Sequence, residues 1–256
     1  MEPVQDPTVA CAQDKSWFPK RDWLARHEAL IIESRKKAAD CKVVFLGDSI
    51  TEGWQGEGKE VWEEEYGHYG ALNLGIGGDE VQHVLWRVQN GEVDGLAPEC
   101  AVILIGTNNI GNVGHAAGAI APGIKILVGE LRKRLPDTRL LLMGTFPRDA
   151  EPDTAFRQEV IALNKMTHQL RDGDKVFYLD IGEYLTDYEQ RIHADTMPDF
   201  LHLSAKGYQI WADKMALTLR RLVHGREGRQ TELIRAVTAG GTPGTTKFNI
   251  ARPSKL

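Results

Sequence analysis

Cysteine is scarce in this 256-residue sequence, which has three residues of this type, Cys11, Cys41 and Cys100. An odd number without metal-type spacing argues against a disulfide framework or a zinc cluster, so we interpret them as reduced packing residues. The sequence also lacks any run of 18 or more apolar residues, so no membrane partner is predicted. Its N-terminus has no charged start followed by an apolar core, which argues against a signal peptide. We expect a cytoplasmic protein, or a secreted one if a leader has been removed.

A strong excess of charge is missing as well. The 31 Lys and Arg residues against 36 Asp and Glu residues give a net charge of −5. The basic cluster at 132–134 lies near the end of a predicted amphipathic helix, where cations interact favourably with the helix dipole. We therefore predict no nucleic-acid partner. The length is sufficient for one large α/β domain with a sizeable core.

Metal and nucleotide motifs are also absent. The histidines show no His-Glu-x-x-His pattern or other ligand spacing, so no metal is predicted. The glycines at 75–78 lack the third glycine of a dinucleotide-binding loop, and no Walker-type Gly-Lys-Ser/Thr occurs. We predict no cofactor.

Short apolar runs alternate with helical patterns along the chain. Strands are predicted at 42–46, 71–74, 101–105, 140–143 and 176–179. Helices are predicted at 23–37, 81–88, 120–135 and 156–170, and from the N-cap Ser204 to about 222. Strands that are nearly continuously apolar and alternate with helices indicate a parallel sheet covered on both faces. The predicted fold is α/β, a three-layer α/β/α sandwich with a five-stranded parallel sheet.

The two ends of the chain differ from this central region. Residues 1–18 are polar and interrupted by proline, and we predict an N-terminal arm. Residues 19–223 form the predicted domain. Residues 224–256 are rich in Gly, Thr and Pro and too poor in apolar residues to add a core, so we predict a C-terminal extension that covers the domain or a neighbouring subunit.

Small polar loops follow the first three predicted strands, at 47–51, 75–79 and 106–109. Ligands of open α/β sheets bind beyond the carboxyl ends of the strands, so we expect the functional site there. Each feature has a structural alternative: Ser49 as a helix N-cap, Asn108 as a turn residue, and Asp199 as the cap of the last helix. We interpret Trp54 as core or pocket wall, and His83 as a packed histidine that leaves a supporting role open.

Four sequence blocks resemble those of the SGNH (GDSL-like) hydrolases. They are Gly-Asp-Ser at 47–49, Gly-Gly-Asp at 77–79, Gly-Thr-Asn-Asn at 106–109 and Asp-x-x-His at 199–202. In detail they look most like the catalytic subunits of intracellular platelet-activating-factor acetylhydrolase and their bacterial esterase relatives. The resemblance implies the flavodoxin-like fold of that family. The Gly-x-Ser-x-Gly elbow of another hydrolase fold is absent, since Thr51 stands in place of its second glycine.

The resemblance also implies roles for individual residues. Ser49 matches the nucleophile, His202 the general base, and Asp199 the carboxylate that orients the imidazole. The oxyanion hole would comprise the amides of Ser49 and Gly78 and the side chain of Asn108. The acyl pocket of the acetylhydrolases maps onto the bulky positions Ile50, Thr107 and Leu201, which predicts acetyl or similarly short esters.

The predicted function is therefore a serine esterase acting through an acyl-enzyme on a small-molecule ester, such as an acetylated carbohydrate or a lipid similar to platelet-activating factor. Two alternatives stay open, a long-chain lipase or thioesterase on the same scaffold and a non-catalytic binding module. A homodimer is suggested by the resemblance and by the long C-terminal extension.

Overall fold

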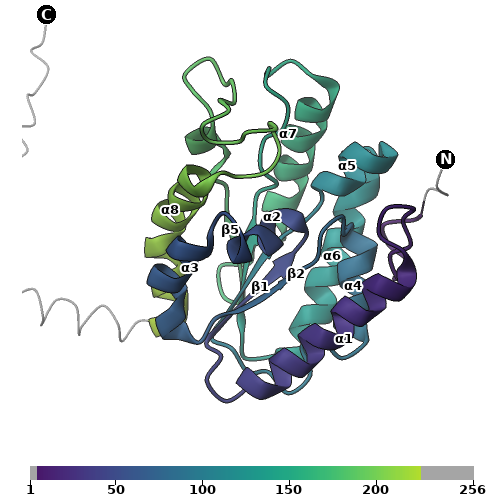
Figure 1. Cartoon of the computed structure of the whole chain (residues 1–256), viewed down its shortest axis with the longest axis vertical. Helices are drawn as coiled ribbons and strands as arrows, with labels where there is room; N and C mark the ends of the chain where they lie inside the picture. The colour runs from purple at the N-terminus through teal and green to yellow at the C-terminus, as the bar shows by residue number, and fades with distance from the viewer. Residues whose placement is uncertain (1–4, 226–256) are drawn as a thin grey trace, which may run out of the picture.

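The computed structural model describes residues 5–225, and a parallel sheet lies at its centre (Figure 1). The five strands follow the order β2-β1-β3-β4-β5. Their bounds are Val43–Gly47 (β1), Leu72–Gly75 (β2), Cys100–Leu104 (β3), Arg139–Met143 (β4) and Val176–Leu179 (β5). All neighbouring pairs are parallel. This is the flavodoxin-like order, and it confirms the predicted fold class.

Helices cover both faces of the sheet, as Figure 1 shows. The longer helices are Lys20–Lys37 (α1), Lys59–Tyr66 (α3), Val81–Gln89 (α4), Ala117–Arg134 (α6), Ala155–Thr167 (α7) and Ala205–His224 (α8). Side chains of α1, α4, α6 and α7 pack in one hydrophobic cluster. Those of α3 and α8 pack in a second cluster on the opposite face. Successive residues of β1 alternate between the two clusters, because strand side chains point to opposite faces in turn.

Short helical segments complete the fold. They are the α-helices Ser49–Glu52 (α2) and Thr107–Val113 (α5), and the 3₁₀ helices Gly53–Gln55 (η1), Gly67–Tyr69 (η2), His168–Leu170 (η3) and Gly182–Leu185 (η4). Helices α2, α3 and α5 were not predicted from the sequence. In α5 the run Thr-Asn-Asn-Ile-Gly-Asn has low intrinsic helix propensity, so its local sequence does not indicate a helix.

The N-terminal segment, residues 5–18, lies against the domain. The Cys11 N–H donates to the carbonyl of Gln82, and the Gln5 side chain meets the ring of His83 at 2.9 Å. Of the predicted C-terminal extension, residues 226–256 lie outside the described residues. No helix of the described part has both the length and the apolar character needed to cross a bilayer.

Candidate active site

Ser49 lies just beyond the end of β1, with one residue between it and Gly47. The preceding residue, Asp48, is the N-cap of α2, and its Oδ1 accepts from the Ile50 N–H at 3.0 Å. Ser49 is therefore the first residue of the helix and not its cap, which removes the structural alternative for this serine. Burial raises the pKa of the Asp48 carboxyl to about 6. Gly47 is required sterically, because a Cβ there would lie 2.2 Å from Thr51 Oγ1.

The imidazole of His202 connects Ser49 to Asp199. Ser49 Oγ lies 2.9 Å from His202 Nε2, although 153 positions separate the two residues in the sequence. On the other side of the ring, His202 Nδ1 lies 2.6 Å from Asp199 Oδ2. With Nδ1–H donating to the carboxylate, Nε2 is left as the acceptor for the serine proton. The three side chains thus form one continuous chain of hydrogen bonds.

A tight turn sets the positions of Asp199 and His202. Asp199 Oδ1 accepts from the N–H groups of Leu201 and His202, at 3.1 and 2.7 Å, while Oδ2 faces the imidazole. Burial opposes ionisation of Asp199, but the hydrogen bonds from His202 outweigh it, so the pKa of this carboxyl lies below its ordinary value. Asp199 is thus charged and holds the imidazole. Helix α8 is capped by Ser204, as predicted, and not by Asp199.

The turn is anchored to α7 and the segment before it. Phe200 has a φ of 60° and Asp149 a φ of 65°, left-handed conformations that are uncommon outside glycine. The Asp149 N–H donates to the Phe200 carbonyl at 2.9 Å. Arg157, nearly buried, donates to the carbonyls of Arg148, Asp149 and Gln190. These bonds hold the segment that carries His202 against the domain.

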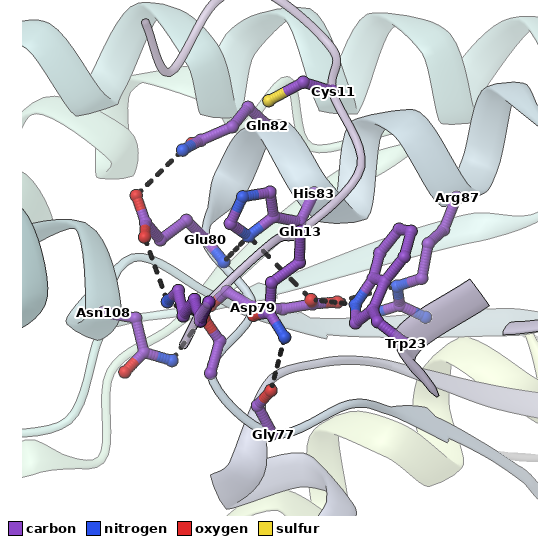
Figure 2. Close-up of polar contacts among 12 residues, drawn as sticks. Cys11, Gln13, Trp23, Gly77, Asp79, Glu80, Gln82, His83, Arg87 and Asn108 are labelled. Atoms are coloured by element: carbon purple, nitrogen blue, oxygen red, sulfur yellow. Dashed lines mark hydrogen bonds and ion pairs between the residues drawn. The ribbon is translucent and has the colours of Figure 1, made fainter. Parts of the chain in front are cut away.

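The glycine loop after β2, residues 75–79, lies beside Ser49, since a Cβ on Gly77 would lie 3.9 Å from Ser49 Cβ, and the start of α5 is bonded to this loop. Gly78 has a φ of 76°, in the region that favours glycine. Within residues 5–225 its N–H donates to no other group. Asn108 is 7% exposed and its Nδ2 donates to the Asp79 carbonyl at 2.9 Å, as Figure 2 shows. Since Nδ2 carries two hydrogens, the second remains available to a ligand.

A buried ion-pair network lies beneath this loop. Arg87 is 0% exposed and donates to Asp79 Oδ2 at 2.7 Å and to Glu92 Oε1 at 2.5 Å. It also donates to the carbonyls of Leu74 and Gly47, which lie at the ends of β2 and β1. Burial lowers the pKa of Arg87, but Glu92 and Asp79 outweigh this and the net pKa is raised. A permanent cation therefore holds the two strand ends together.

The three acyl-pocket positions are each next to a site residue in the sequence: Ile50 follows Ser49, Thr107 precedes Asn108, and Leu201 precedes His202. Ile50 and Thr107 are 2% and 3% exposed, and Leu201 is half-buried beside His202. Arg148 donates to the carbonyl of Thr107 at 2.9 Å. Trp54, by contrast, is 0% exposed and packs in the core, so it is not positioned to touch a substrate.

Three residues of the N-terminal segment also reach the glycine loop. Gln13 Nε2 donates to the Gly77 carbonyl at 3.4 Å, and Lys15 Nζ donates to the Gly78 carbonyl at 2.6 Å. The ring of Trp17 lies over Gly78. Sequence reasoning missed all three, because a polar segment with single Gln, Lys and Trp residues carries no periodicity. The described residues contain no group of three His, Cys, Asp or Glu side chains arranged to hold a metal.

A parallel sheet with a serine, a histidine and a carboxylate joined at its carboxyl edge is an arrangement typical of hydrolases with an α/β/α fold. Comparison with known proteins gives the family. The chain belongs to the GDSL-like Lipase/Acylhydrolase family, whose model matches residues 45–210. It is a carboxylic ester hydrolase, as the resemblance predicted.

Several relatives are similar over most of the chain. Platelet-activating factor acetylhydrolase IB subunit alpha1 from Homo sapiens is 32% identical over 213 residues, covering 83% of this chain and 89% of that protein. A GDSL-like lipase structure from Bacteroides thetaiotaomicron matches with a TM-score of 0.61 at 19% identity, over 76% of this chain and 98% of that one. An acetylxylan esterase from Geobacillus stearothermophilus matches with a TM-score of 0.55 at 18% identity, over 71% and 93%.

Proposed function

We propose that the protein is a serine esterase that hydrolyses short, acetyl-type esters through an acyl-enzyme on Ser49. One observation carries the proposal: the imidazole of His202 lies 2.9 Å from Ser49 Oγ and 2.6 Å from the carboxylate of Asp199. This arrangement suits a nucleophilic hydroxyl whose proton is taken by an oriented base.

In the proposed reaction, Ser49 Oγ attacks the ester carbonyl carbon while its proton moves to His202 Nε2. Asp199 holds the ring and stabilises the imidazolium that forms. The tetrahedral intermediate places its negative charge on the former carbonyl oxygen, which the amides of Ser49 and Gly78 and Nδ2 of Asn108 are proposed to bind. Collapse expels the alkoxide, which takes the proton from His202 and leaves the acyl group on Ser49.

In the second half of the reaction, a water molecule hydrolyses the acyl-enzyme by the same steps in reverse order. His202 takes a proton from the water as it attacks the acyl carbon, and returns this proton to Ser49 Oγ as the acid leaves. Each proton thus passes through His202 Nε2. Of the two exposed members, His202 has 45% of its side-chain surface accessible and Asp199 has 56%, which is compatible with entry of ester and water from solvent.

The proposed substrate range follows from Ile50, Thr107 and Leu201. Side chains of this size around the carbonyl, two of them buried and Leu201 half-buried, would exclude long acyl groups, whereas an extra methylene in a fitting pocket contributes only about 1–3 kcal/mol of attraction. The ester substrate is proposed to be an O-acetylated carbohydrate or a lipid similar to platelet-activating factor. The first is supported by the name of the Geobacillus esterase, and the second by the name of the human relative.

The nucleophile is tested by labelling with a fluorophosphonate. The wild-type chain should be modified at Ser49 and should hydrolyse p-nitrophenyl acetate, while Ser49→Ala should do neither and remain folded by circular dichroism. Ser204→Ala is a serine control at the half-buried N-cap of α8, outside the proposed triad, and should keep both properties. Labelling of Ser49→Ala at the wild-type rate would refute the assignment.

The acyl range is tested with p-nitrophenyl esters from acetate to palmitate. We expect kcat/KM to fall steadily beyond the shortest chains. A preference for eight carbons or more would instead support a long-chain lipase or thioesterase. Acetate release from acetylated xylan and from acetyl phospholipids would then separate the two proposed alcohol classes.

A homodimer is also proposed, from the resemblance and from the length of residues 224–256. Light scattering on the full chain and on a chain ending at Val223 tests it. A dimer that becomes a monomer on truncation would support the role of the extension, and a monomer in both cases would refute the dimer.

A further inference from the structure

The glycine loop after β2 is bound by side chains of the N-terminal segment, which precedes the first of the four sequence blocks at 47–49. Gln13 and Lys15 come from the N-terminal segment, yet they are 0% and 5% exposed. Their amide and ammonium groups donate to the carbonyls of Gly77 and Gly78 (Figure 2 draws the Gln13 contact). The ring of Trp17 lies over the same glycine, so close that a Cβ on Gly78 would come within 2.4 Å of it.

These contacts fix the two peptide groups on either side of Gly78. The Gly77 carbonyl and the Gly78 N–H belong to one planar peptide group and point in opposite directions. Holding that carbonyl against Gln13 therefore sets the direction of the N–H. The Gly78 carbonyl, held by Lys15, fixes the next peptide plane. Glycine has little conformational preference of its own, so external contacts are needed to keep one orientation.

The contact of Lys15 with the Gly78 carbonyl affects the geometry of the loop more than the charge of the site. Its ammonium group lies 3.1 Å from Glu80 Oε1, and the Glu80 side chain is only 3% exposed. The buried carboxylate offsets most of the positive charge that Lys15 would otherwise direct at the site. Glu80 also caps α4, and Asn109 contacts it at 3.4 Å from α5. Lys15 thus links the N-terminal segment, the glycine loop and the start of α5.

We infer that Lys15 and Gln13 are positioning residues for the oxyanion hole, and that the N-terminal segment is thereby a working part of the active site. This inference rests on the proposed function, since it assigns a task to the Gly78 amide in that reaction. The two residues do not touch the substrate. They hold the amide in the direction in which it meets the developing negative charge.

The test compares variants by their activity per active site. Active sites are counted by the final extent of fluorophosphonate labelling, so a partly unfolded sample is corrected for. Lys15→Met alone would leave Glu80 buried and unpaired, so the double variant Lys15→Met/Glu80→Gln removes both charges together. Glu80→Gln alone is its reference, because it keeps the contact from Lys15 to the Gly78 carbonyl. Lys20→Met, an exposed lysine nearby, is the matched control.

We expect kcat for p-nitrophenyl acetate to be about 10- to 100-fold lower in the double variant than in Glu80→Gln, as small misplacements of catalytic groups produce. KM and the pH profile should change little, because the triad is intact. The rate of fluorophosphonate labelling should fall in parallel, while its final extent does not. Lys20→Met should match the wild type.

Equal kcat per labelled site in the double variant and in Glu80→Gln would overturn the inference. Any lower total activity of the double variant would then reflect fewer folded molecules. Should the double variant not fold, Gln13→Leu replaces it, since it removes a carbonyl contact without exposing a buried charge. It should lower kcat by about threefold, a small factor because 3.4 Å is a long hydrogen bond. A wild-type kcat in Gln13→Leu would then reject the inference. Absence of hydrolysis by the wild type would instead refute the proposed function.

Discussion

Asp48 offers a test of the electrostatics directly behind the proposed nucleophile. The side chain is 0% exposed, and Oδ2 has no hydrogen-bond partner within residues 5–225. Burial raises its pKa from 3.8 to about 6. Between these two values the unfolded chain has lost the proton while the folded protein keeps it. Stability conferred by the protonated group is therefore present below pH 3.8 and is lost as the pH rises to about 6.

The size of the effect follows from the shift. Each pKa unit corresponds to 1.36 kcal/mol, so the whole shift is worth about 3 kcal/mol, and Asp48 should reduce the free energy of unfolding by about 2 kcal/mol of this between pH 4 and pH 7. Asp48→Asn cannot ionise, and its Oδ1 can still accept from the Ile50 N–H. Relative to the wild type, the variant should therefore gain about 2 kcal/mol of stability over this range.

Urea unfolding at pH 4, 5, 6 and 7 measures this difference, and contributions from other titrating groups cancel between the two proteins. Asp153→Asn, at an exposed position, is the control and should differ from the wild type by less than about 0.5 kcal/mol at every pH. A difference between Asp48→Asn and the wild type that stays constant from pH 4 to pH 7 would refute the reasoning.

Three further substitutions test other contacts. Asp199→Asn should lower kcat by about 10⁴-fold in steady-state ester hydrolysis, because the amide favours the wrong imidazole tautomer, and a loss below tenfold would contradict the proposed role. Gly78→Ala should lower kcat and cost roughly 1–3 kcal/mol in urea unfolding through its positive φ, while Gly129→Ala in α6 should stabilise. Arg87→Met should cost about 3–5 kcal/mol in the same assay, because two buried carboxylates lose their partner; unchanged stability would show that they are neutral.

Much of the fold was predictable because its signals are local. The five strands are short apolar runs, and their predicted bounds lie within one residue of those observed. Helix α8 was found from its amphipathic pattern and from Ser204, whose hydroxyl does accept from the Gly207 N–H. Helix α5 was missed because its stability comes from tertiary contacts, such as the Asn109 side chain that accepts from the Val81 N–H at 3.0 Å.

The candidate site divides in the same way. Ser49, Asp199 and His202 could be named from sequence blocks, and the structure brings their side chains together. The contacts of Gln13 and Lys15 with the glycine loop could not, because they join positions 63 or 64 residues apart through carbonyl groups that any residue carries. Because every residue has a backbone carbonyl, the sequence of the loop does not indicate which carbonyl accepts a hydrogen bond. The side chain that donates to it is therefore seen in the sequence only as an isolated polar residue.

Arg87 links the stability of the fold to the geometry of the proposed oxyanion hole. Its guanidinium binds the carbonyls of Gly47 and Leu74, at the ends of the two strands that lead to Ser49 and to the glycine loop. It also pairs with Asp79, whose own carbonyl holds Asn108. The three proposed oxyanion donors thus depend on strand ends or side chains tied to one buried cation. Because a buried ion pair is seldom more stable than apolar packing of the same volume, stability alone does not account for this network. The network is explained by its geometry: it holds the ends of β1 and β2 and the Asn108 side chain in a fixed relation at the carboxyl edge of the sheet.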